Sequence, residues 1–373
     1  MEYIDPHLLK PDNLAGLFQL LKKKGYDIIG PTVRDRAIVL DRLASPDDLP
    51  RGWHDRQAPA QYRLEHTDDG TYFSYVVGQE SWKKYLYPPC QKLLTAYRGK
   101  TAFKVESVAD GTNNIAALGM RPCELKALAI QDKIFTGGEI TDPGYQKRRR
   151  KLFIIVANCT HPGGNCFCAS MNTGPRADGG YDLALTEIKT NKDHYFVVEA
   201  ATPAAVEMVG ALKLKKADDA SLKTAEKIMS DAAASMTSRL NVSDLKSTLE
   251  KNFDNPDWES IAARCLACGN CTMVCPTCFC TTMQDYTALD GSEAERLRLW
   301  DSCHTIDFSY IHGGSIRNSG LSRYRQWVMH KLAYWVDQFG THGCVGCGRC
   351  ITWCPVGIDI TATARQIAGQ ETS

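Results

Sequence analysis

The chain has 373 residues, more than one ordinary domain, so we expect two or three domains. Its 44 lysines and arginines nearly balance its 43 aspartates and glutamates, and the formal net charge of +1 disfavours both a basic nucleic-acid surface and an acidic interaction tail. No apolar run approaches the roughly 20 residues that a bilayer crossing requires, and the first residues lack a secretion signal. We therefore predict a cytoplasmic protein that has no membrane span and binds no nucleic acid.

Strands and helices alternate along the first 200 residues. In chain order, we predict a helix over 13–25 and strands over 27–30, 37–40 and 72–78. Two apolar runs, over 114–120 and 152–157, flank a helical pattern that starts at Glu124, which predicts a β-α-β unit with parallel strands. A hairpin-like pair of strands over 181–187 and 194–199 follows it.

Sixteen cysteines are the most informative feature of the composition. Because cytosolic thiols stay reduced, we interpret them as metal ligands rather than as a disulfide framework. Two runs, 265–276 and 344–355, share the spacing C-x2-C-x2-C-x3-C-P. This spacing is the bacterial ferredoxin pattern for [4Fe–4S] clusters, in which the fourth cysteine of each run ligates the other cluster.

Crossed ligation assigns four cysteines to each of two clusters. The first set is Cys265, Cys268, Cys271 and Cys354, and the second set is Cys344, Cys347, Cys350 and Cys275. Zinc is the alternative, because four thiolates can also hold zinc. Structural zinc normally uses two C-x2-C knuckles, however, so paired four-cysteine runs that end in Cys-Pro favour iron–sulfur clusters.

Four more cysteines follow the two parallel strands of the β-α-β unit. Cys123 and Cys159 come directly after these strands, whose carboxyl ends share one edge of the sheet, and the turn-rich segment 160–168 folds Cys166 and Cys168 back toward that edge. Four converging thiolates would make a third cluster site. The alternatives are a zinc site and four buried, inert cysteines.

These patterns divide the chain into three parts. We predict an α/β (or α+β) domain with a partly parallel sheet and the third site over 1–215, a helical linker over 216–255, and a mainly α-helical two-cluster ferredoxin-like module over 256–373. The 68 residues between Cys275 and Cys344 exceed what a minimal ferredoxin needs, and residues 321–339 within them have helical spacing.

Several cysteines and charged residues fall outside these sets. Packing beside a cluster is the favoured interpretation for Cys278, Cys280 and Cys303, with a further metal site or redox-active thiols as alternatives, and Cys90 receives no role. Arg264 and Arg349 either tune a nearby cluster or serve as exposed docking charges. The scattered histidines, including His304, are interpreted as packed or solvated.

Motifs of common catalytic sites are absent from the sequence. It has no G-x-G-x-x-G that opens a helix after a strand, no G-x4-G-K-[ST] and no H-E-x-x-H. We therefore expect no FAD or NAD(P) site and no catalytic residue on this chain, and we expect it to pass single electrons through its clusters.

The sequence resembles the iron–sulfur subunits that include the β subunit of cytoplasmic NiFe sulfhydrogenases and the A subunit of anaerobic sulfite reductase. The residues that carry this resemblance are Arg121-Pro-Cys-Glu-Leu125, the segment 166–175, the two cluster runs, Cys275-Pro-Thr-Cys-Phe-Cys280, Trp300-Asp-Ser-Cys303, Arg323-Tyr-Arg325 and His330-Lys331. The resemblance also favours a third [4Fe–4S] cluster at Cys123, Cys159, Cys166 and Cys168.

The resemblance implies a relay function. It implies an electron-transfer subunit of an oxidoreductase, placed between a flavin- and NAD(P)-binding subunit and a catalytic NiFe hydrogenase subunit. A siroheme sulfite reductase subunit is the alternative catalytic partner, and a redox-sensing iron–sulfur protein is an alternative of another class. The neutral charge and the lack of a DNA-binding helix pattern count against the sensor.

Overall fold

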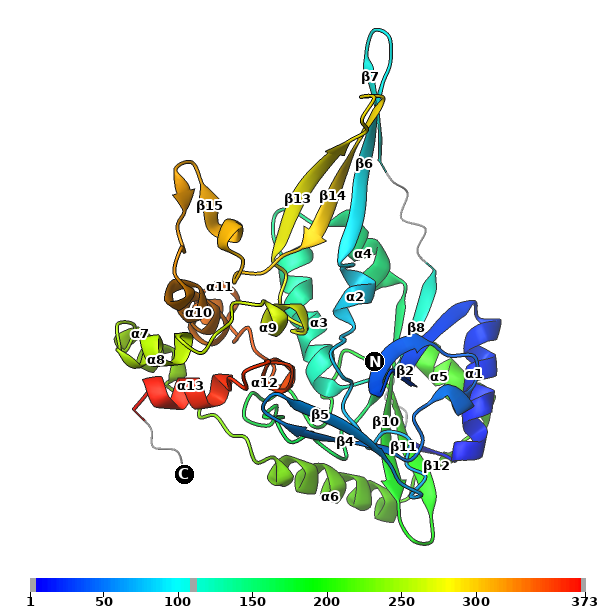
Figure 1. Ribbon diagram of the computed structural model, residues 1–373. Coiled ribbons are helices and arrows are strands. Elements are labelled where there is room, and N and C mark those ends of the chain that lie inside the picture. Colours follow the sequence, from blue (N-terminus) through cyan, green and yellow to red (C-terminus); the bar gives the residue numbers. More distant parts are fainter. Residues whose placement is uncertain (1–4, 108–112, 370–373) are drawn as a thin grey trace.

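A mixed eight-stranded sheet forms the centre of the molecule (Figure 1). The computed structural model describes residues 5–107 and 113–369. In spatial order the strands of the sheet are β12 (Lys215–Lys216), β1 (His7–Leu9), β11 (His194–Ala200), β10 (Leu183–Lys189), β9 (Leu152–Ala157), β8 (Asn114–Met120), β2 (Tyr26–Arg34) and β3 (Ala37–Arg42). The four strands β10, β9, β8 and β2 are mutually parallel, and the strands outside them pair antiparallel.

The predicted β-α-β unit lies in the middle of this sheet. Strand β8 pairs parallel with β9, and the helix α3 (Pro122–Phe135) connects them together with α4 (Pro143–Arg150). Strand β9 reads Leu-Phe-Ile-Ile-Val-Ala because both of its faces are covered. Pro122 starts α3 at its first turn, where no backbone N–H is needed, so Cys123 lies just past the carboxyl end of β8.

Helices pack against the sheet, and shorter elements line its borders. Helix α1 (Leu14–Lys23) contacts β2 and also α5 (Pro203–Leu212), whereas α6 (Asp219–Ser235) runs along β10 and β11. The hairpin β4 (Trp53–Ala58) and β5 (Gln61–His66), the helix α2 (Lys83–Leu86) and 3-10 turns at Pro11–Asn13 and Pro46–Asp48 complete this part, whereas a 3-10 turn at Ile306–Ser309 belongs to the C-terminal part.

One predicted strand is wrong: the segment 72–78 is buried but belongs to no strand. Side chains rather than a neighbouring strand bond to the backbone of its first residues, whereas Gly78 at its end donates to the carbonyl of Ile38 in β3 at 2.8 Å. Glu187 accepts hydrogen bonds from the amides of Tyr72 (2.8 Å) and Phe73 (2.9 Å), and Arg121 donates to the carbonyls of Phe73 and Tyr75. The apolar residues of this segment therefore indicate burial correctly but not a sheet.

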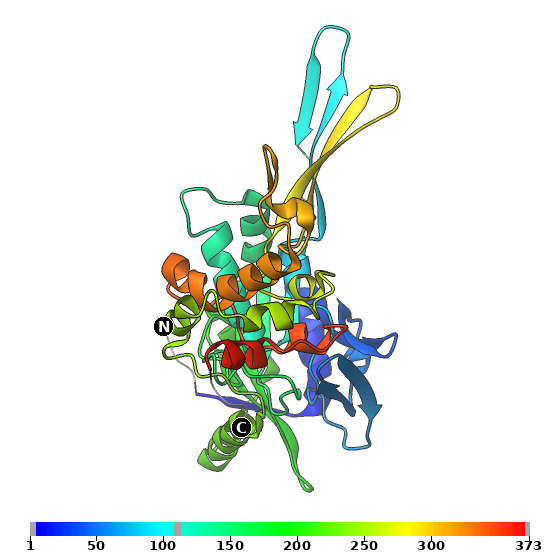
Figure 2. The same ribbon diagram turned by 60° about the vertical axis from the view of Figure 1, so that its left-hand side comes forward.

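A second sheet forms an arm that projects from the body (Figures 1 and 2). Its strands, in spatial order, are β13 (Thr281–Thr287), β14 (Glu293–Trp300), β6 (Cys90–Arg98) and β7 (Phe103–Ser107). The pairing of β14 with β6 joins residues that the sequence assigned to different domains. The division at 215 and 255 stays a prediction.

The C-terminal part is mainly helical, as the sequence predicts. Its helices are α7 (Leu245–Lys251), α8 (Asp257–Ala262), α9 (Asn270–Met273), α10 (Gly320–Met329), a π turn at His330–Tyr334, α11 (Trp335–Phe339), α12 (Arg349–Thr352) and α13 (Ile360–Ile367). The helix predicted over 321–339 corresponds to α10, the π turn and α11 together. The segment between the two cluster runs also contains β13, β14 and the small hairpin β15 (Tyr310–Ile311) and β16 (Gly314–Ser315), which the helical expectation missed.

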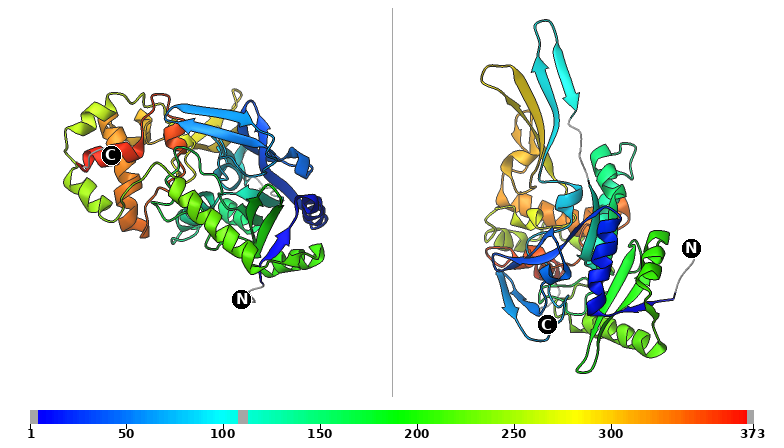
Figure 3. Two further views of the ribbon diagram at one scale, coloured as in Figure 1. Left: turned by 90° about the horizontal axis from the view of Figure 1, so that it is seen from below. Right: turned by 90° about the vertical axis from the view of Figure 1, so that its right-hand side faces the viewer.

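Separate apolar cores support the two parts and meet between them. One core surrounds the large sheet, and another lies among the C-terminal helices. Phe167 and Met171, from the segment that follows β9, pack into the helical core, and the amide of Phe167 donates to the carbonyl of Gly346 at 2.8 Å. The loops at the sheet edge are thereby held against the ferredoxin-like module (Figure 3).

Candidate metal centres

The two cysteine runs fold into the same local backbone. Two residues after the first cysteine of each run, Ala267 (φ 51°) and Gly346 (φ 64°) adopt the left-handed conformation. This turn directs their amides toward the sulfurs of Cys265 and Cys344, both at 3.4 Å. Glycine is required only at the second turn, where an added Cβ would lie 2.7 Å from the backbone of Cys168.

The first predicted set of cysteines lines one hollow, which we call the helical hollow. It encloses about 410 Å³ among α9, α10 and the loops around them. Its lining includes all four cysteines of the first set, Cys265, Cys268, Cys271 and Cys354, together with Cys350 and His304. Burial first, and then the neighbouring thiols of the set, raise the pKa of Cys271 well above its ordinary value.

His304 has an unusual position at the helical hollow. Its side chain is buried, yet neither ring nitrogen has a hydrogen-bond partner among the described residues. A buried polar group without a partner costs about 1–3 kcal/mol. The sulfurs of a cluster in the hollow would supply the missing acceptor, so the residues present fit an iron–sulfur cluster.

The second set, which we call the middle set, surrounds a buried lysine. Cys275 interacts electrostatically with Cys344, Cys347 and Cys350. Burial, together with Cys347 and Cys275, raises the pKa of Cys344 to about 12. Lys331, on the π turn, donates to the sulfur of Cys275 at 3.2 Å and to Thr277 at 2.6 Å. This ammonium would stabilise negative charge on the set.

The four remaining candidates line a third hollow at the carboxyl edge of the sheet, which we call the sheet-edge hollow. It encloses about 380 Å³ and is lined by Cys123, Cys159, Cys166 and Cys168, and by Cys347 of the middle set. Burial and the neighbouring Cys168 raise the pKa of Cys123 and of Cys166 well above the ordinary value. These buried thiols need a cation to become thiolates.

Two buried arginines supply positive charge to the sheet-edge hollow. Arg349 pairs with buried Glu124 at 2.7 Å, and Arg121 donates to backbone carbonyls of the segment 72–78. Both arginines line the hollow, and Arg121 Nε and Arg349 Nη1 have no partner among the described residues. An anionic cluster in the hollow would accept from these atoms, so this site also fits the group.

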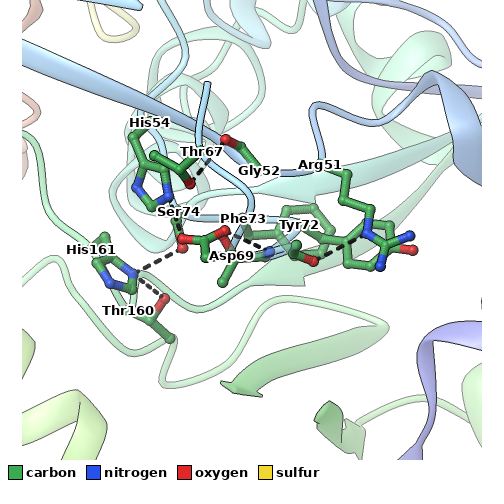
Figure 4. Close-up of polar contacts among 12 residues, drawn as sticks. Arg51, Gly52, His54, Thr67, Asp69, Tyr72, Phe73, Ser74, Thr160 and His161 are labelled. Carbon is green, nitrogen blue, oxygen red and sulfur yellow. Dashed lines mark hydrogen bonds and ion pairs between the residues drawn. The ribbon is translucent and has the colours of Figure 1, made fainter. Parts of the chain in front are cut away.

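A loop network joins the segment 72–78 to the loop that follows Cys159 (Figure 4). His161, two residues after Cys159, lies with Nδ1 3.1 Å from the hydroxyl of Ser74 and 3.0 Å from that of Thr160. His54 pairs with Asp69 at 2.6 Å in the same network. These contacts tie the segment 72–78, which contributes Val76 to the lining of the sheet-edge hollow, to the cysteine-bearing loop.

The sequence pattern of the two cysteine runs favours iron–sulfur clusters over zinc. Structural zinc normally uses two C-x2-C knuckles, whereas each run here supplies four cysteines and ends in Cys-Pro.

The three sites follow one another through shared lining residues. Cys350 of the middle set lines the helical hollow, and Cys347 of the same set lines the sheet-edge hollow. The sulfur of Cys166 also donates to the carbonyl of Cys347 at 3.7 Å. The middle set therefore adjoins both of the other sites, and the three sites follow one another in the order helical hollow, middle set, sheet-edge hollow.

The cysteines without a predicted ligand role cluster near the middle set, with the exception of exposed Cys90 on the arm. The Cys303 thiol donates a hydrogen bond to the sulfur of Cys280; this bond outweighs the effect of burial and lowers the pKa of Cys280 to about 7. Cys278 is in similar contact with Cys275.

Among the charged and polar groups that line the hollows or lie beside the middle set, the sequence suggested a tuning role only for Arg349. Arg349 is buried, which favours the tuning role over the docking role, whereas Arg264 is exposed. Arg121 and Lys331 appeared only as marks of the resemblance, and His304 was interpreted as packed or solvated. No signal in their spacing separates such residues from ordinary surface charges, because their burial depends on tertiary packing.

Comparison with known proteins agrees with an iron–sulfur protein. A 4Fe–4S dicluster domain matches residues 264–358. The sulfhydrogenase 2 subunit beta of Pyrococcus furiosus is 31% identical over 253 residues, which cover 67% of this chain and 73% of that protein. No solved structure is significantly similar to the chain.

The fold and the cysteine sites define an iron–sulfur electron-transfer subunit. The chain belongs to the family of iron–sulfur subunits that includes the sulfhydrogenase β subunit. Among the described helices, none combines the length and apolar character that a membrane crossing requires.

Proposed function

We propose that this chain relays single electrons through three [4Fe–4S] clusters, between a flavin- and NAD(P)-binding subunit and a catalytic NiFe hydrogenase subunit. The observation that carries this proposal is the contact of the middle set with both hollows. The middle set contributes Cys350 to the lining of the helical hollow and Cys347 to that of the sheet-edge hollow, so each outer cluster would adjoin the middle one. Each cluster, when bound, accepts and returns one electron at a time.

The residues of this chain would hold and tune these clusters. Cys265, Cys268, Cys271 and Cys354 would ligate the cluster in the helical hollow; Cys344, Cys347, Cys350 and Cys275 the middle cluster; and Cys123, Cys159, Cys166 and Cys168 the sheet-edge cluster. Lys331, Arg121 and Arg349 would stabilise the reduced, more negative state of the clusters beside them. The relay needs no catalytic residue on this chain.

The projecting arm supports assembly with other subunits. All five residues of β7 are exposed, including Phe103 and Val105, and Leu289 lies exposed at the tip of the β13–β14 hairpin. Exposed apolar side chains gathered on one element are typical of a surface that a partner covers. The name of the related P. furiosus protein, a subunit, supports the same view.

Metal content and co-purification test the proposal. The reconstituted chain should contain about 12 iron and about 12 sulfide per chain, because each of three cubes holds four of each. Zinc in place of iron, or fewer than about 8 iron, would contradict three clusters. In the native complex, nickel supports the hydrogenase partner, and siroheme absorbance would support the sulfite reductase alternative instead.

A further inference from the structure

Two thiols without a ligand role meet at the root of the projecting arm. Strands β13 and β14 pair from Thr281 with Trp300, and the amide of Asp301 donates to the carbonyl of Cys280 at 2.9 Å. Cys303 follows two residues later, and its thiol is in hydrogen-bond contact with the sulfur of Cys280. The two cysteines therefore close the base of the hairpin from opposite ends.

The surroundings of this pair are positively charged. Lys83 is buried, and its ammonium lies 3.7 Å from the centre of the Trp300 ring and 3.4 Å from the carbonyl of Met273. It interacts with the thiols of Cys278, Cys275 and Cys280, and Lys331 interacts with the Cys280 thiol. Nearby ammonium groups favour the thiolate, which is the form of cysteine that reacts.

The pair also adjoins two of the candidate cluster sites. Cys278 lies in contact with Cys275 of the middle set and interacts with Cys280. Cys303 interacts with Cys271, which lines the helical hollow. Clusters in the middle set and in the helical hollow could therefore accept the electrons that leave the pair.

We propose that Cys280 and Cys303 form a reversible disulfide that exchanges two electrons with the adjoining clusters. This inference rests on the proposed function, because the clusters are the electron acceptors. The pair would add a two-electron store to a relay of one-electron carriers.

The oxidation balances within the chain. The Cys280 thiolate and the Cys303 thiol form one S–S bond, and the remaining proton of Cys303 passes to solvent, which both side chains reach in part. Two electrons leave, and one goes to each of two oxidised clusters. Reduction reverses the step: two electrons from reduced clusters break the S–S bond, and solvent returns the proton.

Differential alkylation tests the proposal directly. The cluster-loaded chain is poised anaerobically at a series of potentials, alkylated while folded, and then unfolded and mapped by mass spectrometry. We expect a linked Cys280–Cys303 peptide at oxidising potentials and two alkylated cysteines at reducing potentials, while exposed Cys90 is alkylated at every potential. If Cys280 and Cys303 remain unlinked at every potential, the proposal is overturned.

A coulometric titration provides a second measure with matched variants. The chain should take up about five electrons, three for the clusters and two for the disulfide, and Cys280→Ser and Cys303→Ser should each take up about three. Cys90→Ser is the control and should keep about five. A loss of about four iron in Cys280→Ser would instead make this thiol a cluster ligand and would overturn the pair.

The iron content separates the two proposals. A wild-type chain with fewer than about 8 iron contradicts the three-cluster function, whatever the peptide map contains. A chain with about 12 iron and no link between Cys280 and Cys303 contradicts only the disulfide.

Discussion

The sheet-edge hollow and the helical hollow offer the same four thiols in different surroundings. At the sheet edge, Cys159, Cys166 and Cys168 are 5–8% exposed, and two buried arginines face the space between them. In the helical hollow, Cys268 is exposed, and the buried polar atoms without a partner in the described lining are the two ring nitrogens of His304 and the indole N–H of Trp327. The sheet-edge site thus has buried cysteines and two arginines in its wall, whereas the helical site has an exposed cysteine and no arginine in its wall, although Arg323 interacts with Cys265 and His304.

This difference predicts different reduction potentials for identical clusters. Reduction adds negative charge, which the guanidinium groups of Arg121 and Arg349 stabilise inside a low-dielectric wall. Because these guanidinium groups are buried, solvent screens them little, and they interact with the cluster more strongly than exposed charges would. We therefore expect the sheet-edge cluster to be reduced at a higher potential than the helical cluster, with the middle cluster, beside Lys331, also raised.

Substitution of a cysteine ligand should have the largest effect, and each substitution should affect only one of the two hollows. Cys166→Ser should cost the sheet-edge cluster, about 4 of about 12 iron, and Cys354→Ser should cost the helical cluster to the same extent. Iron analysis and electron paramagnetic resonance of the two variants measure this. Equal spectra from both variants would contradict the assignment of these cysteines to different sites.

Arg349→Leu should have the second-largest effect, because it removes one partner of a buried ion pair. Glu124 would remain as an uncompensated buried carboxylate, so we expect a loss of about 3–5 kcal/mol in the free energy of unfolding. The potential of the sheet-edge cluster should fall by roughly 100 mV, the value for one charge at a distance of about 6 Å and an effective dielectric constant of about 20. Denaturant titration and potentiometry measure the two effects.

The double variant Arg349→Leu with Glu124→Leu serves as the control for that prediction. It removes both charges, so most of the lost stability should return while the potential stays below the wild-type value. An unchanged potential in both variants would mean that Arg349 does not face the cluster.

Glu187→Gln should loosen the segment 72–78, which contributes Val76 to the lining of the sheet-edge hollow, and should leave the helical hollow unchanged. Glutamine places an NH2 group where one of the two carboxylate oxygens accepts, so either Tyr72 or Phe73 loses its acceptor, and we expect a loss of about 1.5–3 kcal/mol. The rate at which oxygen bleaches the sheet-edge cluster should rise, and that of the helical cluster should not. Glu207→Gln, in an exposed pair with Lys24, is the matched control and should change stability by less than about 0.5 kcal/mol.

His304→Leu should have the smallest effect, confined to the helical cluster. Loss of an N–H to sulfur hydrogen bond worth about 1 kcal/mol should lower the potential of that cluster by about 40 mV. In the cluster-free chain, the same substitution should be neutral or stabilising, because both ring nitrogens then lack a partner. A destabilised cluster-free variant with an unchanged potential in the loaded one would assign His304 a purely structural role.

The sequence predicted the central fold because its signals were local. The runs over 114–120 and 152–157 became β8 and β9 with the same bounds, and the expected parallel pairing brought Cys123 and Cys159 to one hollow. The crossed pattern of the two runs likewise agrees with Cys354 lining the hollow of the first run. In these cases a short stretch of chain carries the whole signal.

The rest depended on contacts between distant segments. The segment 72–78 has the apolar character of a strand, but Glu187 and Arg121, more than 40 residues away, bond to the backbone of its first residues. The arm forms because β14 pairs with β6, which lies about 200 residues away in the sequence. Local sequence periodicity cannot predict such a pairing. The same limit applies to His304 and Arg349, whose burial beside cysteine sites is set by packing alone.

Potentiometric titration of the loaded chain, followed by electron paramagnetic resonance, tests the central claim most directly. We predict three one-electron components, with the highest-potential component absent from Cys166→Ser and the lowest absent from Cys354→Ser. A loaded chain in which only two components appear, or in which Cys354→Ser removes the component that is reduced first, would contradict the account of three clusters in line with a cationic site at the sheet edge.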